Sequence, residues 1–327
     1  MHILMTGAAG MIGRKLTARL VKDGHLNGQP IEKLTLTDVV APAVPQGFSG
    51  KIDLTVSDLP APGEAGKAIA EKPDAIFYLA GVVSGEAETD FDKGYRVNLE
   101  GTQQLLAAIR KTGGGYKPKF IFTSSMAVFG APFPPAVHDE FHLTPLTSYG
   151  TQKAICELLL ADHTRRGFLE GVGIRLPSIV VRPGKPNKAA SGFFSSIIRE
   201  PLAGQETVLP VDDSILHTHA SPRSAIGFLI HAAGLTRAQL GDRININMPG
   251  VCCTVAEQIA ALRRVAGDKA AARIHREPDE LVMRIVAGWP SRFDARRAGA
   301  LGFKAEASFD DIIRAHIEDE LGGKIAA

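Results

Sequence analysis

Tyr149 and Lys153 are spaced four residues apart, directly after Ser148. On a helix this spacing places two side chains on one face, one turn apart. A tyrosine hydroxyl is a poor base at neutral pH because it normally titrates near about 10, but a neighbouring ammonium favours the phenolate. The pair therefore predicts a proton acceptor for an alcohol, which becomes a carbonyl once it also loses a hydride. The same spacing is common on exposed helix faces, which is the alternative interpretation. The chemistry also requires an acceptor for the hydride, and the start of the chain offers a candidate site for it.

A glycine-rich turn follows the first apolar run, residues 3–6, which is typical of a buried strand. Gly7, Gly10 and Gly13 precede a predicted helix over 14–22. Gly7 suits a tight turn, Gly10 lets a pyrophosphate approach the backbone, and Gly13 lets the helix pack close to the sheet. The first N–H groups of that helix then attract phosphate. We predict the first half of a dinucleotide-binding unit, with an ordinary βα turn as the alternative.

A carboxylate, Asp38, ends the second predicted strand, residues 34–37. It lies slightly beyond the ~20-residue offset expected for a ribose-binding carboxylate after the glycine turn. Such a group accepts hydrogen bonds from the ribose hydroxyls and would repel a 2′-phosphate, and no basic residue follows within 39–41. The predicted cofactor is therefore NAD rather than NADP, with a solvated strand-end Asp as the alternative.

Strands and helices alternate through the first half of the chain, which predicts an α/β fold with a doubly wound parallel (Rossmann) sheet. We predict an NAD-binding domain over 1–183, to which 221–250 returns, and a smaller, interleaved substrate-binding region over 184–327. The predicted strands are 3–6, 34–37, 75–79, 120–123, 173–176 and 244–248. The predicted helices are 14–22, 98–111, 149–164, 192–202, 221–235, 254–266 and 280–289.

Composition excludes several classes of protein. The 327 residues are 45% hydrophobic, so a sizeable core is expected. A net charge of +2 with 6% aromatic residues gives no case for nucleic acid, and no apolar run is long enough for a membrane span. The first predicted strand begins at once, so we expect no signal peptide. Three cysteines without metal spacing or a disulfide framework, and His217 and His219 without a third ligand, predict no metal and a cytoplasmic soluble protein.

Taken together, the chain resembles the extended, epimerase-like branch of the short-chain dehydrogenase/reductase superfamily over nearly its whole length. The segments that carry the resemblance are 6–13, 58–59, 79–81, 97–102, 122–130 and 148–158. The resemblance implies a catalytic set of Ser125, Tyr149 and Lys153, with Ser124 as the alternative serine. It also implies that NAD contacts Met11, Ile12, Asp58, Leu59, Leu79, Ala80, Gly81, Asn98, Tyr149, Lys153, Pro177 and Ser178 besides the three glycines and Asp38.

Segments 148–158 and 174–187 are similar to those of the D-erythronate dehydrogenase group. This similarity implies NAD-dependent oxidation of D-erythronate to 2-dehydro-D-erythronate. A sugar acid also needs a carboxylate anchor, for which an Arg offers two parallel donors. The candidate substrate-binding residues are Ser84, Ser125, Arg182, Lys185, Asn187 and Arg223. Each basic candidate could equally be a surface charge or half of an ion pair.

Three departures from nucleotide-sugar enzymes are visible. Phe129 replaces a common tyrosine, Pro177 and Ser178 replace an aromatic–asparagine step, and Leu216 stands where those enzymes hold a phosphate with arginine. The first implies a missing substrate hydrogen bond, and the other two disfavour a large diphosphate substrate. Two alternatives remain: a nucleotide-sugar epimerase or dehydratase of the same fold, and a non-catalytic dinucleotide sensor. A homodimer through the two long predicted helices of the first half is a further expectation.

Overall fold

The computed structural model describes residues 1–184 and 190–326, and the chain divides into two compact units. Unit 1 comprises residues 1–128, 147–175 and 226–246. Unit 2 comprises residues 129–146, 176–225 and 247–327. We predicted a boundary after 183 and a return over 221–250, whereas the structure has the boundary after Arg175 and the return over 226–246. Segment 129–146, which we assigned to the NAD-binding domain, folds with unit 2.

Hydrogen bonds within unit 2 explain the placement of 129–146. The backbone of Val137 bonds to Arg292 O and to Asp294 N, both at 2.9 Å. The carboxylate of Asp139 accepts from Asn247 N at 2.7 Å and pairs with Arg297 at 2.9 Å. All these partners lie more than a hundred residues further along the chain, so no local sequence pattern announces them.

Unit 1 is built on a seven-stranded sheet with the order β12-β8-β7-β6-β1-β4-β5. Its strands are β1 His2–Thr6, β4 Lys33–Asp38, β5 Lys51–Val56, β6 Ala75–Tyr78, β7 Lys119–Ser125, β8 Glu170–Leu176 and β12 Asn245–Asn247. β1 pairs in parallel with both β4 and β6, so Ile3 lies between Leu34 and Ala75. β6 pairs in parallel with β7. The central strands are almost continuously apolar because the sheet is covered on both faces.

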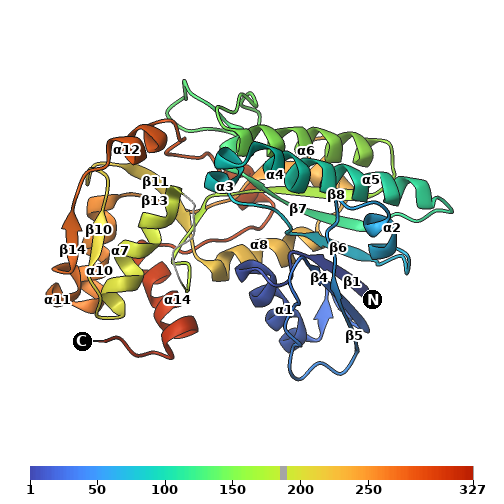
Figure 1. The fold of residues 1–327 in the computed structure, drawn as a ribbon, viewed down its shortest axis with the longest axis horizontal. Coiled ribbons are helices and arrows are strands. Elements are labelled where there is room, and N and C mark those ends of the chain that lie inside the picture. Colours follow the sequence, from blue (N-terminus) through green and yellow to red (C-terminus); the bar gives the residue numbers. More distant parts are fainter. Residues whose placement is uncertain (185–189, 327) are drawn as a thin grey trace. The chain divides into compact units, whose positions relative to one another are not determined.

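Helices lie on both faces of this sheet, as a doubly wound fold requires. Helices α5 (Gly101–Thr112) and α6 (Ser148–Arg165) cover one face, and α1 (Met11–Asp23) and α8 (Pro222–Gly234) the other (Figure 1). The predicted Rossmann fold is thereby confirmed. Shorter elements of this unit are β2 His25–Leu26, β3 Gln29–Pro30, α2 Glu64–Ala68, α3 Ser84–Thr89, α4 Phe91–Gly94, the π-helix η1 Tyr95–Glu100, η2 Met126–Val128 and α9 Arg237–Leu240.

Strand β5 is missing from our strand predictions. It is the edge strand of the sheet and pairs in parallel with β4. Its residues are mostly exposed, and Leu54 and Val56 keep 39% and 62% of their surface. The segment has no continuous apolar run, and we overlooked the alternation of Ile52, Leu54 and Val56 with polar residues. The charges of Lys51 and Asp53 suit a strand whose outer edge is unpaired.

Unit 2 contains a three-stranded sheet of order β13-β11-β9 and a two-stranded sheet of β10 and β14. Its strands are β9 Ser178–Ile179, β10 Thr207–Leu209, β11 Leu216–Ala220, β13 Val251–Thr254 and β14 Ile274–Arg276. Its helices are η3 Ala190–Gly192, α7 Phe193–Leu202, α10 Val255–Ala266, α11 Asp268–Ala271, α12 Glu280–Ala287, α13 Arg296–Ala300 and α14 Phe309–Leu321. The core forms where the apolar faces of α7, α10 and α14 meet, around Phe194, Leu262 and Ile312. We predicted α7, α10 and α12 closely, but not α14.

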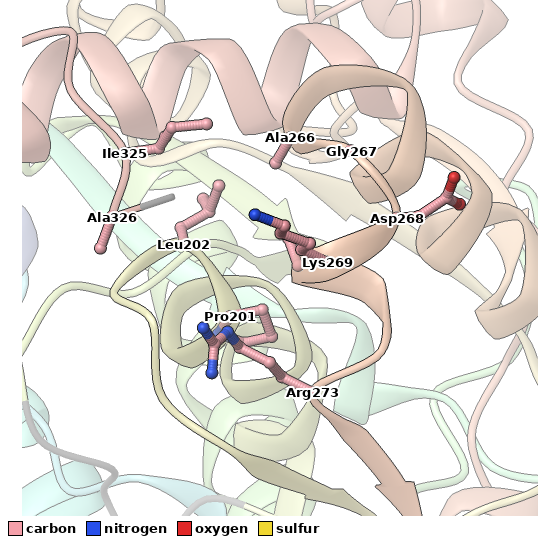
Figure 2. A pocket seen from close by; sticks show the side chains of 10 residues that line it. Pro201, Leu202, Ala266, Gly267, Asp268, Lys269, Arg273, Ile325 and Ala326 are labelled. Atoms are coloured by element: carbon pink, nitrogen blue, oxygen red, sulfur yellow. The ribbon is translucent and has the colours of Figure 1, made fainter.

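A hollow in unit 2 lies between the end of α7, the start of α11 and the C-terminal segment (Figure 2). Its wall is mostly small or apolar, with Leu202, Ala266 and Ile325 among the lining side chains. Lys269 and Arg273 contribute the cationic groups, and Arg273 already pairs with Glu206. None of the predicted site residues that the structure describes lines this hollow, so we do not assign it to the reaction.

Candidate active site

The glycine turn brings the end of β1 against the end of β6. Gly7 has a φ of +71°, and a Cβ there would lie 2.7 Å from the backbone N of Ala80. A Cβ on Gly13 would lie 2.3 Å from Gly7 O, inside contact distance. Thr6 Oγ1 accepts hydrogen bonds from the backbone N atoms of Leu79 and Ala80 at 3.2 and 3.3 Å. The turn is therefore closed by backbone atoms that leave no room for side chains.

The N-terminus of α1 follows this turn. Its N-cap, Gly10, is extended (φ −67°, ψ 166°), and no side chain among the described residues caps the helix. The first turn carries no acidic residue, and Met11 and Ile12 are only half-buried. Backbone N–H groups and the positive end of the helix dipole are thus presented as the pyrophosphate of a dinucleotide requires. The residues present fit the predicted cofactor.

Asp38 is bound to the glycine turn. Its Oδ2 accepts from the backbone N of Ala9 at 2.9 Å, and its Oδ1 accepts from Val39 N at 2.7 Å. The carboxylate is half-buried and retains acceptor capacity, as a ribose-binding group needs. Asp58 instead forms an ion pair with Arg96 on the π-helix, and Leu59 beside it is buried.

Ser125, Tyr149 and Lys153 all lie in unit 1, on β7 and α6. Thr147 caps α6 by accepting from Gly150 N at 3.0 Å, so Tyr149 stands in the first helical turn. Lys153 is 5% exposed, and its Nζ lies 5.8 Å from the centroid of the Tyr149 ring. The same Nζ donates to Thr123 O at 2.9 Å. The ammonium is thus held in place between the helix and the strand that carries the serine.

The two adjacent serines of β7 have different environments. Ser124 is buried, and its Oγ donates to Glu157 Oε1 at 2.5 Å. Ser125 is half-buried, and its Oγ accepts from Ala127 N at 3.2 Å, which leaves its O–H to be donated. This arrangement favours Ser125 over Ser124 as the substrate-facing serine, which remains a prediction.

Asn98 lies in the π-helix and is buried. Its Oδ1 accepts from Val82 N at 2.9 Å, and its Nδ2 donates to Gln152 Oε1 at 2.7 Å. A Cβ on Gly81 would lie 2.9 Å from Asn98 Oδ1. Asn98 therefore fixes the loop after β6 to helix α6 through its side chain. Gln152 was not among the predicted site residues, because neighbouring residues of a helix point in different directions and its place beside Lys153 is no signal.

The candidate substrate residues are scattered. Arg182 donates through Nε to Ile179 O at 3.0 Å and through Nη2 to Ser191 Oγ at 2.9 Å. Arg223 pairs with Asp319 at 2.6 Å and with Glu318 at 2.9 Å, and these carboxylates raise its pKa. That geometry favours the ion-pair interpretation of Arg223. Ser84 is half-buried at the start of α3, and Lys185 and Asn187 lie outside the described residues.

Pro177 and Ser178 follow β8 and belong to unit 2. Ser178 Oγ lies 2.8 Å from Nε2 of His217, which is buried and stacked on Phe194. Burial lowers the pKa of His217 to about 4. His217 is therefore neutral near pH 7 and serves as a hydrogen-bond partner of Ser178. In the parts of the chain that the structure describes, no group of three His, Cys, Asp or Glu residues could hold a metal ion.

Comparison with known proteins identifies the class. Residues 3–215 match the model of the NAD dependent epimerase/dehydratase family, and the chain belongs to this family. The predicted extended short-chain dehydrogenase/reductase relationship and the predicted cofactor, NAD, are confirmed. Among the described residues, no helix is both long enough and apolar enough to cross a membrane.

Individual relatives extend over the whole chain. A D-erythronate dehydrogenase of Cupriavidus necator is 48% identical over 98% of this chain and 98% of its own length. A D-erythronate dehydrogenase of Haemophilus influenzae is 40% identical, with coverages of 98% and 100%. A solved structure from Agrobacterium tumefaciens, described as a nucleoside-diphosphate-sugar epimerase, is 64% identical with a TM-score of 0.97, covering 100% of this chain and 96% of that chain.

Proposed function

We propose that this protein is a dehydrogenase that oxidises D-erythronate with NAD⁺ to 2-dehydro-D-erythronate, at the carbon next to the carboxylate. The observation that carries the proposal is the full-length similarity to two curated D-erythronate dehydrogenases. The Tyr149–Lys153 pair beside the serine strand β7 supports the same chemistry, because it supplies a base for a secondary alcohol.

In the proposed mechanism, Tyr149 as phenolate accepts the proton of the substrate hydroxyl. Lys153 holds a positive charge next to that ring and offsets its negative charge. Ser125 donates its O–H to the substrate oxygen, which orients it and stabilises the charge that develops there. NAD⁺, when bound, supplies the acceptor for the hydride.

The glycine turn and Asp38 hold the cofactor. Gly10, Met11 and Ile12 present the α1 N-terminus to the pyrophosphate, and Asp38 accepts from the adenosine ribose. Asp58, Leu59, Leu79, Ala80, Gly81, Pro177 and Ser178 stay predicted contacts. Asn98 acts in this proposal through Val82 and Gln152, by shaping the loop after β6.

Arg182 is our proposed anchor for the substrate carboxylate, and its hydrogen bonds to Ile179 O and Ser191 fix the guanidinium plane. Lys185, Asn187 and Ser84 remain predicted helpers. Arg223 is the weaker candidate because two carboxylates already neutralise it.

A nucleotide-sugar epimerase is the second candidate, favoured by the description of the Agrobacterium tumefaciens structure. An epimerase returns the hydride before product release, so it forms no net NADH. Phe129 stands where many relatives carry tyrosine and has no hydroxyl, so it offers a sugar no hydrogen bond, which counts against this candidate. Its ring is buried and packs on Phe141.

One assay separates the candidates. The purified protein is incubated with NAD⁺ and a panel of four-carbon and five-carbon aldonic acids, and NADH is followed by absorbance. D-Erythronate should give the highest kcat/KM. If no acid gives NADH while UDP-glucose is epimerised, the dehydrogenase proposal is wrong. If NAD⁺ binds and neither reaction occurs, the non-catalytic sensor is favoured.

We also propose a homodimer through α5 and α6 and a cytoplasmic location. Leu158 on α6 is 63% exposed, which suits a helical interface. Cys156, Cys252 and Cys253 are all free thiols, which suits a reducing compartment. Sedimentation of the wild type and of Leu158→Glu tests the interface, since only the wild type should sediment as a dimer.

A further inference from the structure

Two successive residues of β7 are tied to two successive turns of α6. Thr123 offers its backbone oxygen to Lys153 Nζ at 2.9 Å, and Ser124 donates its hydroxyl to Glu157 Oε1 at 2.5 Å. The next residue of the strand is the candidate catalytic Ser125. The spacing of the strand and the helix is therefore fixed immediately beside that serine.

Glu157 is held by a second strand as well. Arg175, the last residue of β8 within unit 1, donates through Nε to Oε1 and Oε2 at 2.9 and 3.1 Å and through Nη2 to Oε2 at 2.8 Å. Glu157 is 0% exposed and the Arg175 side chain 5%. One buried carboxylate thus joins α6 to β7 and to β8.

Stability alone does not explain this arrangement. Burying an ion pair costs a large desolvation free energy, and well-packed apolar residues often replace such a pair at no loss of stability. What apolar residues cannot supply is direction, because only the carboxylate fixes the Ser124 hydroxyl and the Arg175 fork at set angles. Tyr149, Lys153 and Glu157 recur every four residues and share one face of α6.

We propose that Glu157 and Ser124 are positioning residues for the oxidation. Their buried bond sets the separation of Ser125 on β7 from Tyr149 and Lys153 on α6, so that one substrate oxygen meets the serine and the tyrosine together. The inference rests on the proposed function only for the identity of the substrate. The proposal also gives Ser124 a role, which is to hold strand β7 in place rather than to contact the substrate.

Two double variants test the proposal without leaving a buried charge. Glu157→Leu with Arg175→Met replaces the pair by apolar side chains and leaves Ser124 without an acceptor. Glu157→Gln with Arg175→Met is also neutral but keeps an amide oxygen for Ser124. We expect the Leu/Met variant to fold, to bind NAD⁺ within about two-fold of wild type and to lose roughly ten- to hundred-fold in kcat. The Gln/Met variant should recover a large part of kcat.

Single variants give an independent reading. Ser124→Ala removes one buried hydroxyl beside the site. Thr164→Val removes one at the far end of α6, where Thr164 Oγ1 donates to Leu160 O at 2.8 Å and accepts from Gly171 N at 3.2 Å. We expect Ser124→Ala to lower kcat several-fold, by about three- to ten-fold, and Thr164→Val to leave kcat unchanged. Both should lower Tm to a similar extent.

The proposal is overturned if the folded Leu/Met variant keeps wild-type kcat. If the double variants do not fold, Ser124→Ala decides: a kcat equal to that of Thr164→Val overturns the proposal. All variants are assayed with whichever compound the wild type turns over, an aldonic acid or a sugar nucleotide. An inert D-erythronate therefore rejects the proposed substrate and leaves the positioning result intact. A wild type that turns over neither overturns both.

Discussion

The carboxylate of Asp38 at the end of β4 accepts a hydrogen bond from the backbone of Ala9 inside the glycine turn, at 2.9 Å. Two strand ends that meet side by side in the sheet are thus joined by a charged acceptor. The same carboxylate is expected to bind the ribose hydroxyls, so it both shapes the turn and selects NAD over NADP.

Replacing Asp38 should weaken NAD binding selectively. Asp38→Ala removes a charged acceptor, and hydrogen bonds to charged groups contribute about 1.5–3 kcal/mol, so Kd for NAD⁺ should rise roughly ten- to hundred-fold. Affinity for NADP⁺ should not fall in the same way, because its 2′-phosphate gains no favourable contact from the carboxylate and is repelled by it. Calorimetric titration of both nucleotides checks this, with Asp23→Ala, which breaks the exposed ion pair to Arg19, as control. An unchanged Kd for NAD⁺ would remove Asp38 from the site.

Tyr149→Phe should abolish turnover while leaving the fold and the cofactor site intact. The variant loses the proton acceptor, so kcat should fall by about 10²–10⁴-fold. NAD⁺ titration should still give a near wild-type Kd. Tyr116→Phe removes a hydroxyl that bonds only Pro73 O in unit 1, at 3.0 Å, and is the matched control. Substantial residual kcat in Tyr149→Phe would rule out this residue as the base.

Gly13→Ala should damage the glycine turn. The added Cβ would meet Gly7 O at 2.3 Å, and neither backbone segment can yield without opening the β1–α1 turn. Overpacking of this kind typically costs about 1–3 kcal/mol. Gly66→Ala in α2 meets nothing within 4 Å and should be neutral or slightly stabilising. Urea unfolding of both variants is the measurement, and equal midpoints would contradict the close approach.

The buried histidines should make the protein acid-sensitive. Burial lowers the pKa of His217 to about 4, and the pKa of His219 is lowered by burial and by His217. Between that value and the usual ~6.5, the unfolded chain binds protons that the folded chain does not, so stability falls as the pH decreases through this window. His217 should contribute a loss of about 2 kcal/mol between pH 7 and pH 5. Urea unfolding of the wild type and of His217→Gln at both pH values checks this. If both proteins lose the same unfolding free energy between the two pH values, the prediction is wrong.

The sequence predicted the parts of this protein that depend on neighbours in the chain. The apolar run at β1, the glycines after it and the four-residue spacing on α6 are local patterns, and each gains its meaning from the others, since each alone has an ordinary structural interpretation. The fold follows from them because parallel strands joined by helices must wind into a covered sheet.

The missed features depend on distant residues. Arg175 is buried with Glu157 as its ion-pair partner, and the two residues are 18 positions apart, so neither segment alone reveals the pair. Segment 129–146 joins unit 2 through Asn247 and Arg297, which no pattern near residue 129 could reveal. Strand β5 is a different case, because the alternation of Ile52, Leu54 and Val56 with polar residues is a local signal that our strand predictions passed over.

Segment 129–146, between the serine strand and the tyrosine helix, begins and ends with two residues in contact. Thr144 Oγ1 donates to Gly130 O at 3.4 Å, and a Cβ on Gly130 would lie 1.9 Å from Thr144 O. Insertions between Gly130 and Thr144 lengthen a loop whose ends are already fixed, and each doubling of the loop length costs only about 0.6 kcal/mol of closure free energy. The stretch between these two residues is itself held to unit 2 through Val137 and Asp139, so changes of length and sequence should be tolerated only where both of those contacts are kept.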